Sequence, residues 1–302
     1  MAKMMLNMER AQLVCDVIGT LAESPVWDER RQTLFWCDIM EKKLHSIVPS
    51  SGKHWTRALP DTVSCLGLCE SGKLIVACGM QILLVDPEND TIETLATIPA
   101  PDDLPCRLND GRVGPDGAFW VGTMDAGAFS DIRPMGQLWR VTATDIRCTE
   151  TGLTCPNGLA FSADGTVMWH SDSVQRWIRR RHFDRRTGLF DEGRIIARPT
   201  KEDGRPDGGC VDGDGRYWSA GVSAGVLNIH GNDGTLLEKI PMPVPHPTMS
   251  CFGGPDFRTL FVTSHRNNMD EETRTRFPRS GGVWAIPANV EGFPAFRFAD
   301  GA

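Results

Sequence analysis

The chain has 302 residues, of which 40% are hydrophobic and 24% are charged, and it carries a formal net charge of −7. This is the composition of an ordinary globular protein that is long enough to bury a large core. The acidic balance argues against nucleic acid or an anionic membrane as the main partner, and no apolar run approaches the roughly 18 residues that a membrane span requires.

The first residues of the chain lack the pattern of a secretory signal. Asn7, Glu9 and Arg10 interrupt the stretch that a signal peptide keeps apolar. The ten cysteines are scattered and include no C-x-x-C pair, which is typical of reduced thiols that act as small buried hydrophobes. We therefore expect a cytoplasmic protein.

A turn followed by a short apolar run recurs along the chain. In order, the copies are DERRQTLFWCD from residue 28, ESGKLIVACG from 70, PDGAFWVGTM from 115, ADGTVMWHSD from 163, GDGRYWSAG from 213 and PDFRTLFVTS from 255. The runs are rich in β-branched and aromatic residues, which favour strands. Asp-Gly and Ser-Gly supply the positive φ that tight hairpins need.

The period of this repeat indicates the fold. Successive turns are roughly 42 to 50 residues apart, which is the length of one four-stranded propeller blade. A sandwich or a barrel does not require so long and regular a period. We predict an all-β protein that forms one domain over residues 1–302, a six-bladed β-propeller with a metal site in its central channel.

The position seven residues before each turn carries the argument for that site. Equivalent positions of radial repeats lie on one ring around the axis, and the six are Glu23, Ser64, Asn109, Asn157, Asp207 and Met249. Two carboxylates and two amides on this ring offer hard oxygen ligands to one divalent cation. Calcium, magnesium and manganese fit best, and zinc or iron(II) are less typical because no His or Cys joins the set. The alternative is that these side chains bond only their own backbone.

The stretch RPDGGCVDGDG at 205–215 is acidic without being a calcium loop. Counting from Asp207, the EF-hand pattern would place Val211 at position five and Trp218 at position twelve, where oxygen ligands are required. Asp214 with the following glycine is instead a hairpin turn, and Asp207 is the member of the ring.

Three other features have two interpretations each. The basic run RWIRRRHFDRR at 176–186 is a solvated hairpin or a site for an anionic partner. His170 and Asp172 make a structural hydrogen bond or contact the substrate. His246 and His265, which flank the final blade, have either a structural role or a direct functional one.

Several stretches resemble the SMP-30/gluconolactonase family, which includes regucalcin and bacterial sugar-acid lactonases, and the resemblance covers nearly the whole chain. The stretches are AESPVWD at 22–28, RLNDGRVGPDGAFWVGTM at 107–124, CPNGLAFSADG at 155–165, PDGGCVDGDGRYW at 206–218 and FGGPDFRTLFVTS at 252–264. Ser24 departs from the pattern, because many members have glycine after the glutamate.

The resemblance implies a six-bladed propeller with one divalent metal in its channel. The family's metal ligands fall on Glu23, Asn157 and Asp207, and its substrate-contacting pair falls on Arg107 and Asn109. The activity it implies is hydrolysis of a sugar-acid lactone to the free aldonic acid. The metal would polarise the carbonyl or the attacking water, and Asp207 is our candidate for the general base.

Other functions remain open from the sequence. They are a calcium-binding regulatory protein of the regucalcin type, an organophosphate or aryl-ester hydrolase, and a WD40-like interaction scaffold. The scaffold is disfavoured because its Trp-Asp pairs close strands, whereas Trp27-Asp28 opens a turn.

Overall fold

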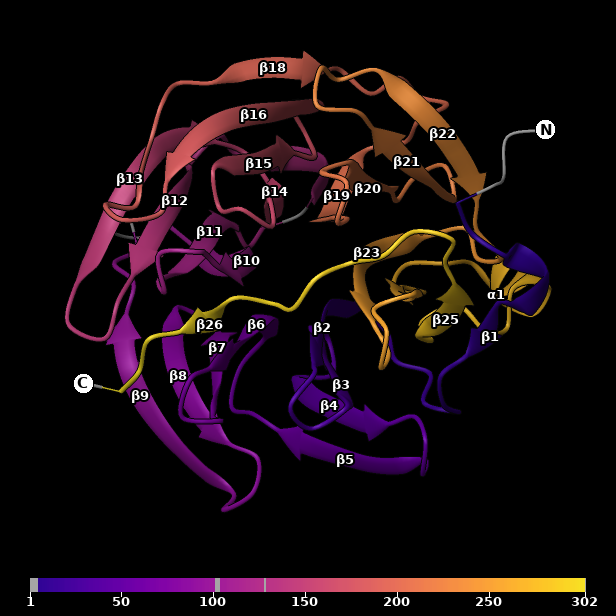
Figure 1. Cartoon of the computed structure of the whole chain (residues 1–302), viewed down its shortest axis with the longest axis horizontal. Coiled ribbons are helices and arrows are strands. Elements are labelled where there is room, and N and C mark those ends of the chain that lie inside the picture. The colour runs from indigo at the N-terminus through magenta and orange to yellow at the C-terminus, as the bar shows by residue number, and fades with distance from the viewer. Residues whose placement is uncertain (1–4, 101–103, 128, 302) are drawn as a thin grey trace.

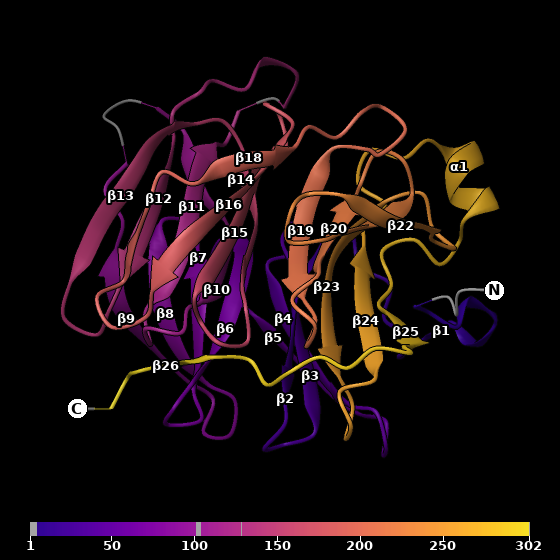
Figure 2. The same ribbon diagram turned by 45° about the horizontal axis from the view of Figure 1, so that its top comes forward.

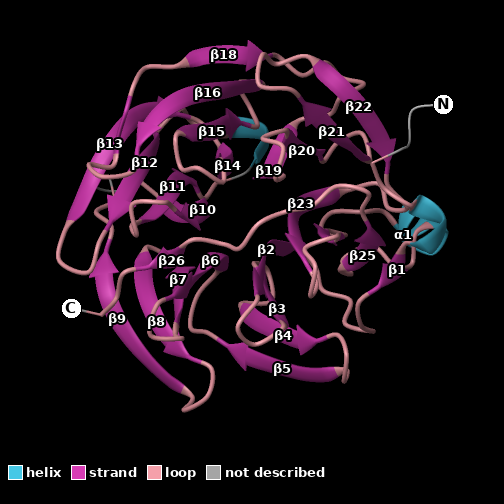
Figure 3. Ribbon diagram, viewed as in Figure 1, coloured by secondary structure: helices cyan, strands magenta, loops and turns pink. Residues whose placement is uncertain are grey.

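A computed structural model describes residues 5–100, 104–127 and 129–301. Six sheets stand in a ring around one axis, so the predicted six-bladed propeller is confirmed (Figure 1). Nearly all regular structure in the described residues is strand (Figure 3). The helical segments there are the 3-10 turns η1 (Met8–Arg10) and η2 (Phe129–Asp131) and the short helix α1 (Glu271–Arg276).

The first three blades follow the chain from the axis outward. The first contains β2 (Ala22–Asp28), β3 (Thr33–Asp38), β4 (Lys43–Val48) and β5 (Lys53–Ala58). The second contains β6 (Val63–Cys69), β7 (Leu74–Cys78), β8 (Gln81–Asp86) and β9 (Thr91–Thr97). The third contains β10 (Cys106–Val113), β11 (Phe119–Asp125), β12 (Gly136–Val141) and β13 (Ile146–Leu153).

The last three blades repeat this order with additions at the outer edge. The fourth contains β14 (Pro156–Phe161), β15 (Val167–Asp172), β16 (Trp177–Asp184), β17 (Leu189–Phe190) and β18 (Arg194–Ala197). The fifth contains β19 (Pro206–Val211), β20 (Tyr217–Gly221), β21 (Val226–His230) and β22 (Leu236–Pro241). The sixth contains β23 (Pro247–Gly253), β24 (Thr259–Ser264), β25 (Trp284–Pro287) and, from the other end of the chain, β1 (Gln12–Leu13).

Both ends of the chain join the ring. β1 pairs with β25, so the sixth blade is completed by the N-terminal segment. β26 (Arg297–Phe298) pairs in parallel with the last residues of β6. The segment leading to β26 crosses the centre of the ring (Figure 1). Hydrogen bonds from Gly213 to Glu291 and from Ala299 to Gly117 attach it to the turns where the innermost strands end.

The innermost strands therefore define two ends of the channel. Figure 2 shows β19 and β23 pointing toward the side that the C-terminal segment crosses. We call this side the closed end, and the side where the innermost strands begin the open end.

Sequence determines these elements locally. The predicted turns contain glycines with positive φ, 71° at Gly117, 71° at Gly165 and 80° at Gly215, a conformation that glycine adopts without strain. Apolar clusters fill the space between neighbouring blades, and the second strands contribute fully buried tryptophans, Trp36, Trp120, Trp169 and Trp218.

All ten cysteines are free thiols. Among the described residues, no helix is long and apolar enough to cross a membrane.

Candidate active site

The innermost strands share an irregularity near the open end. Each loses its register with the second strand of its blade over two or three residues. The steps include Glu23/Val26, Leu108/Gly111, Asn157/Ala160 and Pro206/Gly209. Such bulges bend a strand and re-aim side chains. They explain how consecutive blades present polar groups to one channel.

Two bulges use a left-handed residue directly after the candidate ligand. Ser24 follows Glu23 with a φ of 52°, and Gly158 follows Asn157 with a φ of 61°. Glycine tolerates this conformation best. Ser24, which departs from the family pattern, therefore occupies a position whose backbone conformation suits glycine. Its hydroxyl accepts a hydrogen bond from the Leu66 amide at 3.0 Å.

Glu23 and Asp207 place two carboxylates close enough to influence each other's ionisation. Both are partly buried at the open end. Burial, followed by the charges of Asp207 and Asp110, raises the pKa of Glu23 well above its ordinary value. Burial and the charge of Asp110 raise the pKa of Asp207 to about 7. Each group thus resists carrying its charge unless a positive charge joins it.

The hydrogen bonds leave oxygen atoms of this pair free. One Glu23 oxygen, Oε2, accepts from the Ser24 amide at 2.9 Å. The Asp207 carboxylate accepts no hydrogen bond from any residue that the structure describes. Two half-buried carboxylates with so few donors are the arrangement that a bound cation compensates.

Asn157 adds a neutral oxygen. Its amide Nδ2 donates to Ser173 Oγ at 2.8 Å, and that hydroxyl donates to the carbonyl of Pro206 at 2.6 Å. The chain of bonds ties Asn157 to the residue before Asp207. With Nδ2 used in this way, the amide oxygen is the atom left to act as a ligand.

Arg107 and Asn109 form a pair of their own. Arg107 Nη1 donates to Asn109 Oδ1 and to the carbonyl of Leu108, both at 2.9 Å. Asn109 Nδ2 donates to the carbonyl of Pro156 at 3.0 Å. The Asn109 oxygen therefore accepts a hydrogen bond from Arg107, which the Asn157 oxygen does not. Arg107 is partly buried and keeps further N–H groups free.

The two remaining ring positions bring no charge. Ser64 is buried, and its hydroxyl has no partner among the described residues. Met249 is buried against Gly208, the residue after Asp207.

Two aspartates at the ends of second strands hold the beginnings of ligand-bearing strands. Asp38 accepts from the amides of Thr20 and Leu21 at 2.6 and 3.3 Å, just before β2. Asp172 accepts in the same way from two amides just before β14. Asp172 thus has the structural role that was one of its two interpretations. The sequence analysis did not single out Asp38, although Asp38 ends the run WCD as Asp172 ends WHSD.

His170 lies away from this site. It is buried on β15, with its ring edge-on to Trp177 and its Nδ1 4.0 Å from a Glu150 oxygen. The basic run at 176–186 forms β16 and the turn after it. Its Arg181 is buried and donates to both Glu150 oxygens at 2.7 Å.

Asp110 is the third carboxylate of this site, and the sequence analysis did not identify it. It is buried, accepts from the Leu159 amide at 2.9 Å, and has its pKa raised by burial to about 6. The signal was its place beside Asn109 in RLNDG, because a bulge can turn two successive residues toward one site.

The donor set fits one divalent cation. Glu23, Asp207 and the Asn157 oxygen are hard ligands of the kind that calcium, magnesium and manganese prefer. Within the described ranges, no three His, Cys, Asp or Glu side chains are grouped so as to hold a metal. A cation at this place therefore depends on the amide oxygen as well as on the two carboxylates.

Fold and site together define a six-bladed propeller with an oxygen-rich polar site at one end of its channel. The chain belongs to the family described as SMP-30/Gluconolactonase/LRE-like region, whose model matches residues 21–266. The resemblance read from the sequence is confirmed.

The relatives match more than nine-tenths of the chain. The 6-deoxy-6-sulfogluconolactonase of Pseudomonas putida is 40% identical over 93% of this chain and 96% of its own. Regucalcin from Xenopus laevis is 31% identical over 97% of this chain and 100% of its own. The crystal structure of a calcium-binding protein, regucalcin from Agrobacterium tumefaciens, superposes with a TM-score of 0.88 at 28% identity and covers 95% of this chain and 96% of that one.

Proposed function

We propose that this protein is a lactonase that hydrolyses the lactone of a sugar acid, with a divalent cation held by Glu23, Asn157 and Asp207. The observation that carries the proposal is the pair of half-buried carboxylates at the open end, whose pKa values are raised and which lack enough hydrogen-bond donors. The family description and the name of the P. putida relative support a sugar lactone, and that name supports a six-carbon sugar acid.

The chemistry divides among named side chains. A bound cation would supply Lewis acidity toward the lactone carbonyl and offset the charge of the carboxylates. Asp207 accepts the proton of the attacking water as the new C–O bond forms. That proton then passes to the ring oxygen as the lactone C–O bond breaks. Free N–H groups of Arg107 donate to the oxygen that gains negative charge, and Asn109 fixes the orientation of Arg107.

The test is metal content and lactone hydrolysis measured on the same preparations. We expect Glu23→Gln, Asn157→Ala and Asp207→Ala to lose stoichiometric metal by elemental analysis, and to lose activity on gluconolactone, while remaining folded. Ser64→Ala is the matched control, because it changes the same ring without removing a proposed ligand. Full metal content in Asp207→Ala would contradict the ligand assignment.

A second candidate is a calcium-binding regulatory protein, which the regucalcin relatives favour. A binding protein has no use for a group that stabilises charge in a transition state. We therefore expect Arg107→Ala to lower kcat/KM by roughly 30- to 1000-fold, with metal affinity nearly unchanged. Wild-type activity no higher than spontaneous hydrolysis, across pentono- and hexonolactones, would favour the binding protein instead.

A further inference from the structure

Arg205 stands at the open end, two residues before Asp207 and directly before β19. The strand bulges between Pro206 and Gly209, so the place of the Arg205 side chain is taken from its contacts and from its effect on neighbouring groups. The charge of Arg205 is close enough to oppose the rise in the pKa of Asp207.

The guanidinium group of Arg205 has no anionic partner in the described structure. Its Nε is buried without a hydrogen bond, and no ion pair to a described residue involves it. Several half-buried arginines are paired, namely Arg31 with Asp28, Arg140 with Asp116 and Arg216 with Asp212. Arg112 and Arg180 share with Arg205 an unsatisfied buried Nε, but Arg205 is the one that lies directly before the strand carrying Asp207. A buried donor without a hydrogen bond is unfavourable, so an acceptor on a ligand at this Nε would stabilise the site.

The surroundings hold Arg205 in place without neutralising it. Its guanidinium carbon lies 4.8 Å from the centre of the Phe129 ring. Its backbone amide donates to Ser223 Oγ at 2.9 Å, and its carbonyl accepts from the Val222 amide at 3.1 Å. Aromatic contact and fixed backbone keep the planar donor group available for bidentate bonding.

A second unpartnered donor lies beside it. The rings of His246 and His265 stack with their centres 4.6 Å apart, and His246 Nδ1 lies 3.0 Å from the carbonyl of Val222. His265 Nδ1 is buried and has no partner among the described residues. Burial, His246 and the charge of Arg205 lower the pKa of His265 to about 3. His265 is therefore a neutral hydrogen-bonding group at physiological pH.

We propose that Arg205, assisted by His265, binds an anionic substituent at the end of the substrate remote from the lactone carbonyl. The substrate class is then a sugar-acid lactone that carries an oxyanion, such as a sulfonate, carboxylate or phosphate, on its far carbon. This inference rests on the proposed function, because it places the carbonyl beside Asp207.

The charge of the site supports this class. Three carboxylates, from Glu23, Asp110 and Asp207, lie near three guanidinium groups, from Arg107, Arg112 and Arg205. With a divalent cation bound, the ionised groups leave two net positive charges. An otherwise acidic protein thus has a channel that attracts an anionic substrate.

The test compares glucono-1,5-lactone with its 6-deoxy-6-sulfo counterpart on metal-loaded protein. We expect Arg205→Met to lower kcat/KM for the sulfonated lactone by roughly 10- to 100-fold, the range of a charged hydrogen bond. The readout is the ratio of the two kcat/KM values, because loss of the Arg205 charge also raises the pKa of Asp207 and so acts on both lactones alike. Arg198→Met is the control, because it removes an exposed arginine from the same connection between β18 and β19.

Calorimetric binding of the two stable product acids gives a readout that does not need turnover. The sulfonated acid should bind wild type more tightly than gluconate, and Arg205→Met should abolish the difference. If wild type hydrolyses both lactones and Arg205→Met affects them equally, the anion subsite is wrong and the lactonase stands. If wild type hydrolyses neither lactone but the difference in product binding depends on Arg205, the lactonase fails and the anion subsite stands.

Discussion

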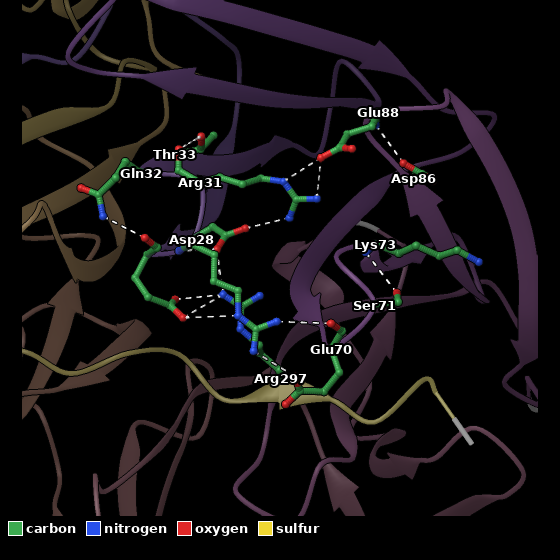
Figure 4. Close-up of polar contacts among 12 residues, drawn as sticks. Asp28, Arg31, Gln32, Thr33, Glu70, Ser71, Lys73, Asp86, Glu88 and Arg297 are labelled. Carbon is green, nitrogen blue, oxygen red and sulfur yellow. Dashed lines mark hydrogen bonds and ion pairs between the residues drawn. The ribbon is translucent and has the colours of Figure 1, made fainter.

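The two ends of the central channel are built by the same six strands and have opposite chemistry. At the open end, Glu23 and Asp207 carry raised pKa values and few hydrogen bonds. At the closed end, Asp28 is fully buried, and Arg297 of β26 donates to it at 2.7 Å and to Glu29 at 2.9 Å (Figure 4). Between the two ends lies a cavity of about 50 Å³ lined by apolar groups, among them Val26, Leu66, Phe161, Phe293 and Phe296.

One segment shows the contrast within a few residues. Asp207 at the start of β19 accepts no hydrogen bond from the described residues. Asp212, just after the end of β19, is fully buried and accepts from Trp218 Nε1 at 2.9 Å, from Arg216 Nε at 2.6 Å and from two turn amides. A carboxylate that is fully satisfied stabilises the fold, whereas one left unsatisfied is available for a ligand. Unsatisfied and satisfied carboxylates are thus separated along the direction of the strands.

The largest expected effect is on turnover at the open end. Asp207→Asn keeps an oxygen ligand but removes the proton acceptor, so kcat should fall by roughly 10²- to 10⁴-fold while some metal is retained. Asp212→Asn is the matched change at the closed end. It should lower the free energy of unfolding by about 1–3 kcal/mol and leave the kcat of folded protein near wild type. A fully metallated Asp207→Asn enzyme with a normal rate would show that the base lies elsewhere.

The next effect is on stability at the closed end. Arg297→Met should lower the free energy of unfolding by about 3–5 kcal/mol, because it leaves Asp28 buried with only Arg31 as a charged partner. Chemical denaturation measures the loss. Metal content and kcat of the folded fraction should stay unchanged. A fall in metal affinity would mean that the two ends are coupled.

A third prediction uses pH to distinguish the ends. The folded pKa of Asp207 is about 7, above its ordinary value of 3.8. The contribution of Asp207 to the free energy of unfolding is therefore fully present at acidic pH and is lost as the pH rises to about 7. Chelator-treated protein should therefore lose roughly 2–4 kcal/mol between about pH 4 and 7. Asp207→Asn should reduce this slope, with Glu23 and Asp110 accounting for the remainder, and added calcium should restore stability. A flat profile for chelator-treated wild type would contradict the raised pKa.

Asp28 should respond in the opposite sense. Burial opposes its ionisation, but hydrogen bonds from Arg297 and Arg31 outweigh burial and hold its pKa below the ordinary value. Its contribution is present above the ordinary pKa and is lost only as the pH falls through the lowered one. Acid should therefore reduce the stabilisation that Asp28 provides at the closed end, whereas it removes the destabilising charge of Asp207 at the open end.

Local signals in the sequence predicted the repeat and the blades, because each depends on spacing within one blade, and the ring of oxygen-bearing side chains stays a prediction of the same kind. They did not predict contacts made across the ring. β26 is a two-residue strand with no alternation, and its pairing with β6 joins segments more than 200 residues apart. Likewise, nothing in RPDGG distinguishes an unpaired Arg205 from an arginine in an ion pair, since the partners come from other blades. The sequence likewise does not show that the Asn109 oxygen accepts a hydrogen bond from Arg107.

The smallest effect is expected at Ser24, which lies between the two ends and lines the apolar cavity. Glycine would relieve a φ of 52°, but it would also remove the acceptor of the buried Leu66 amide. Because an unmade buried hydrogen bond costs more than one left-handed residue saves, Ser24→Gly should lower the free energy of unfolding by about 0.5–1.5 kcal/mol. The Ser24 amide still donates to Glu23, so metal content should remain stoichiometric. Calorimetric melting with elemental analysis measures both quantities. A loss of metal without a loss of stability would show that the Ser24 hydroxyl, rather than the backbone of the bulge, positions Glu23.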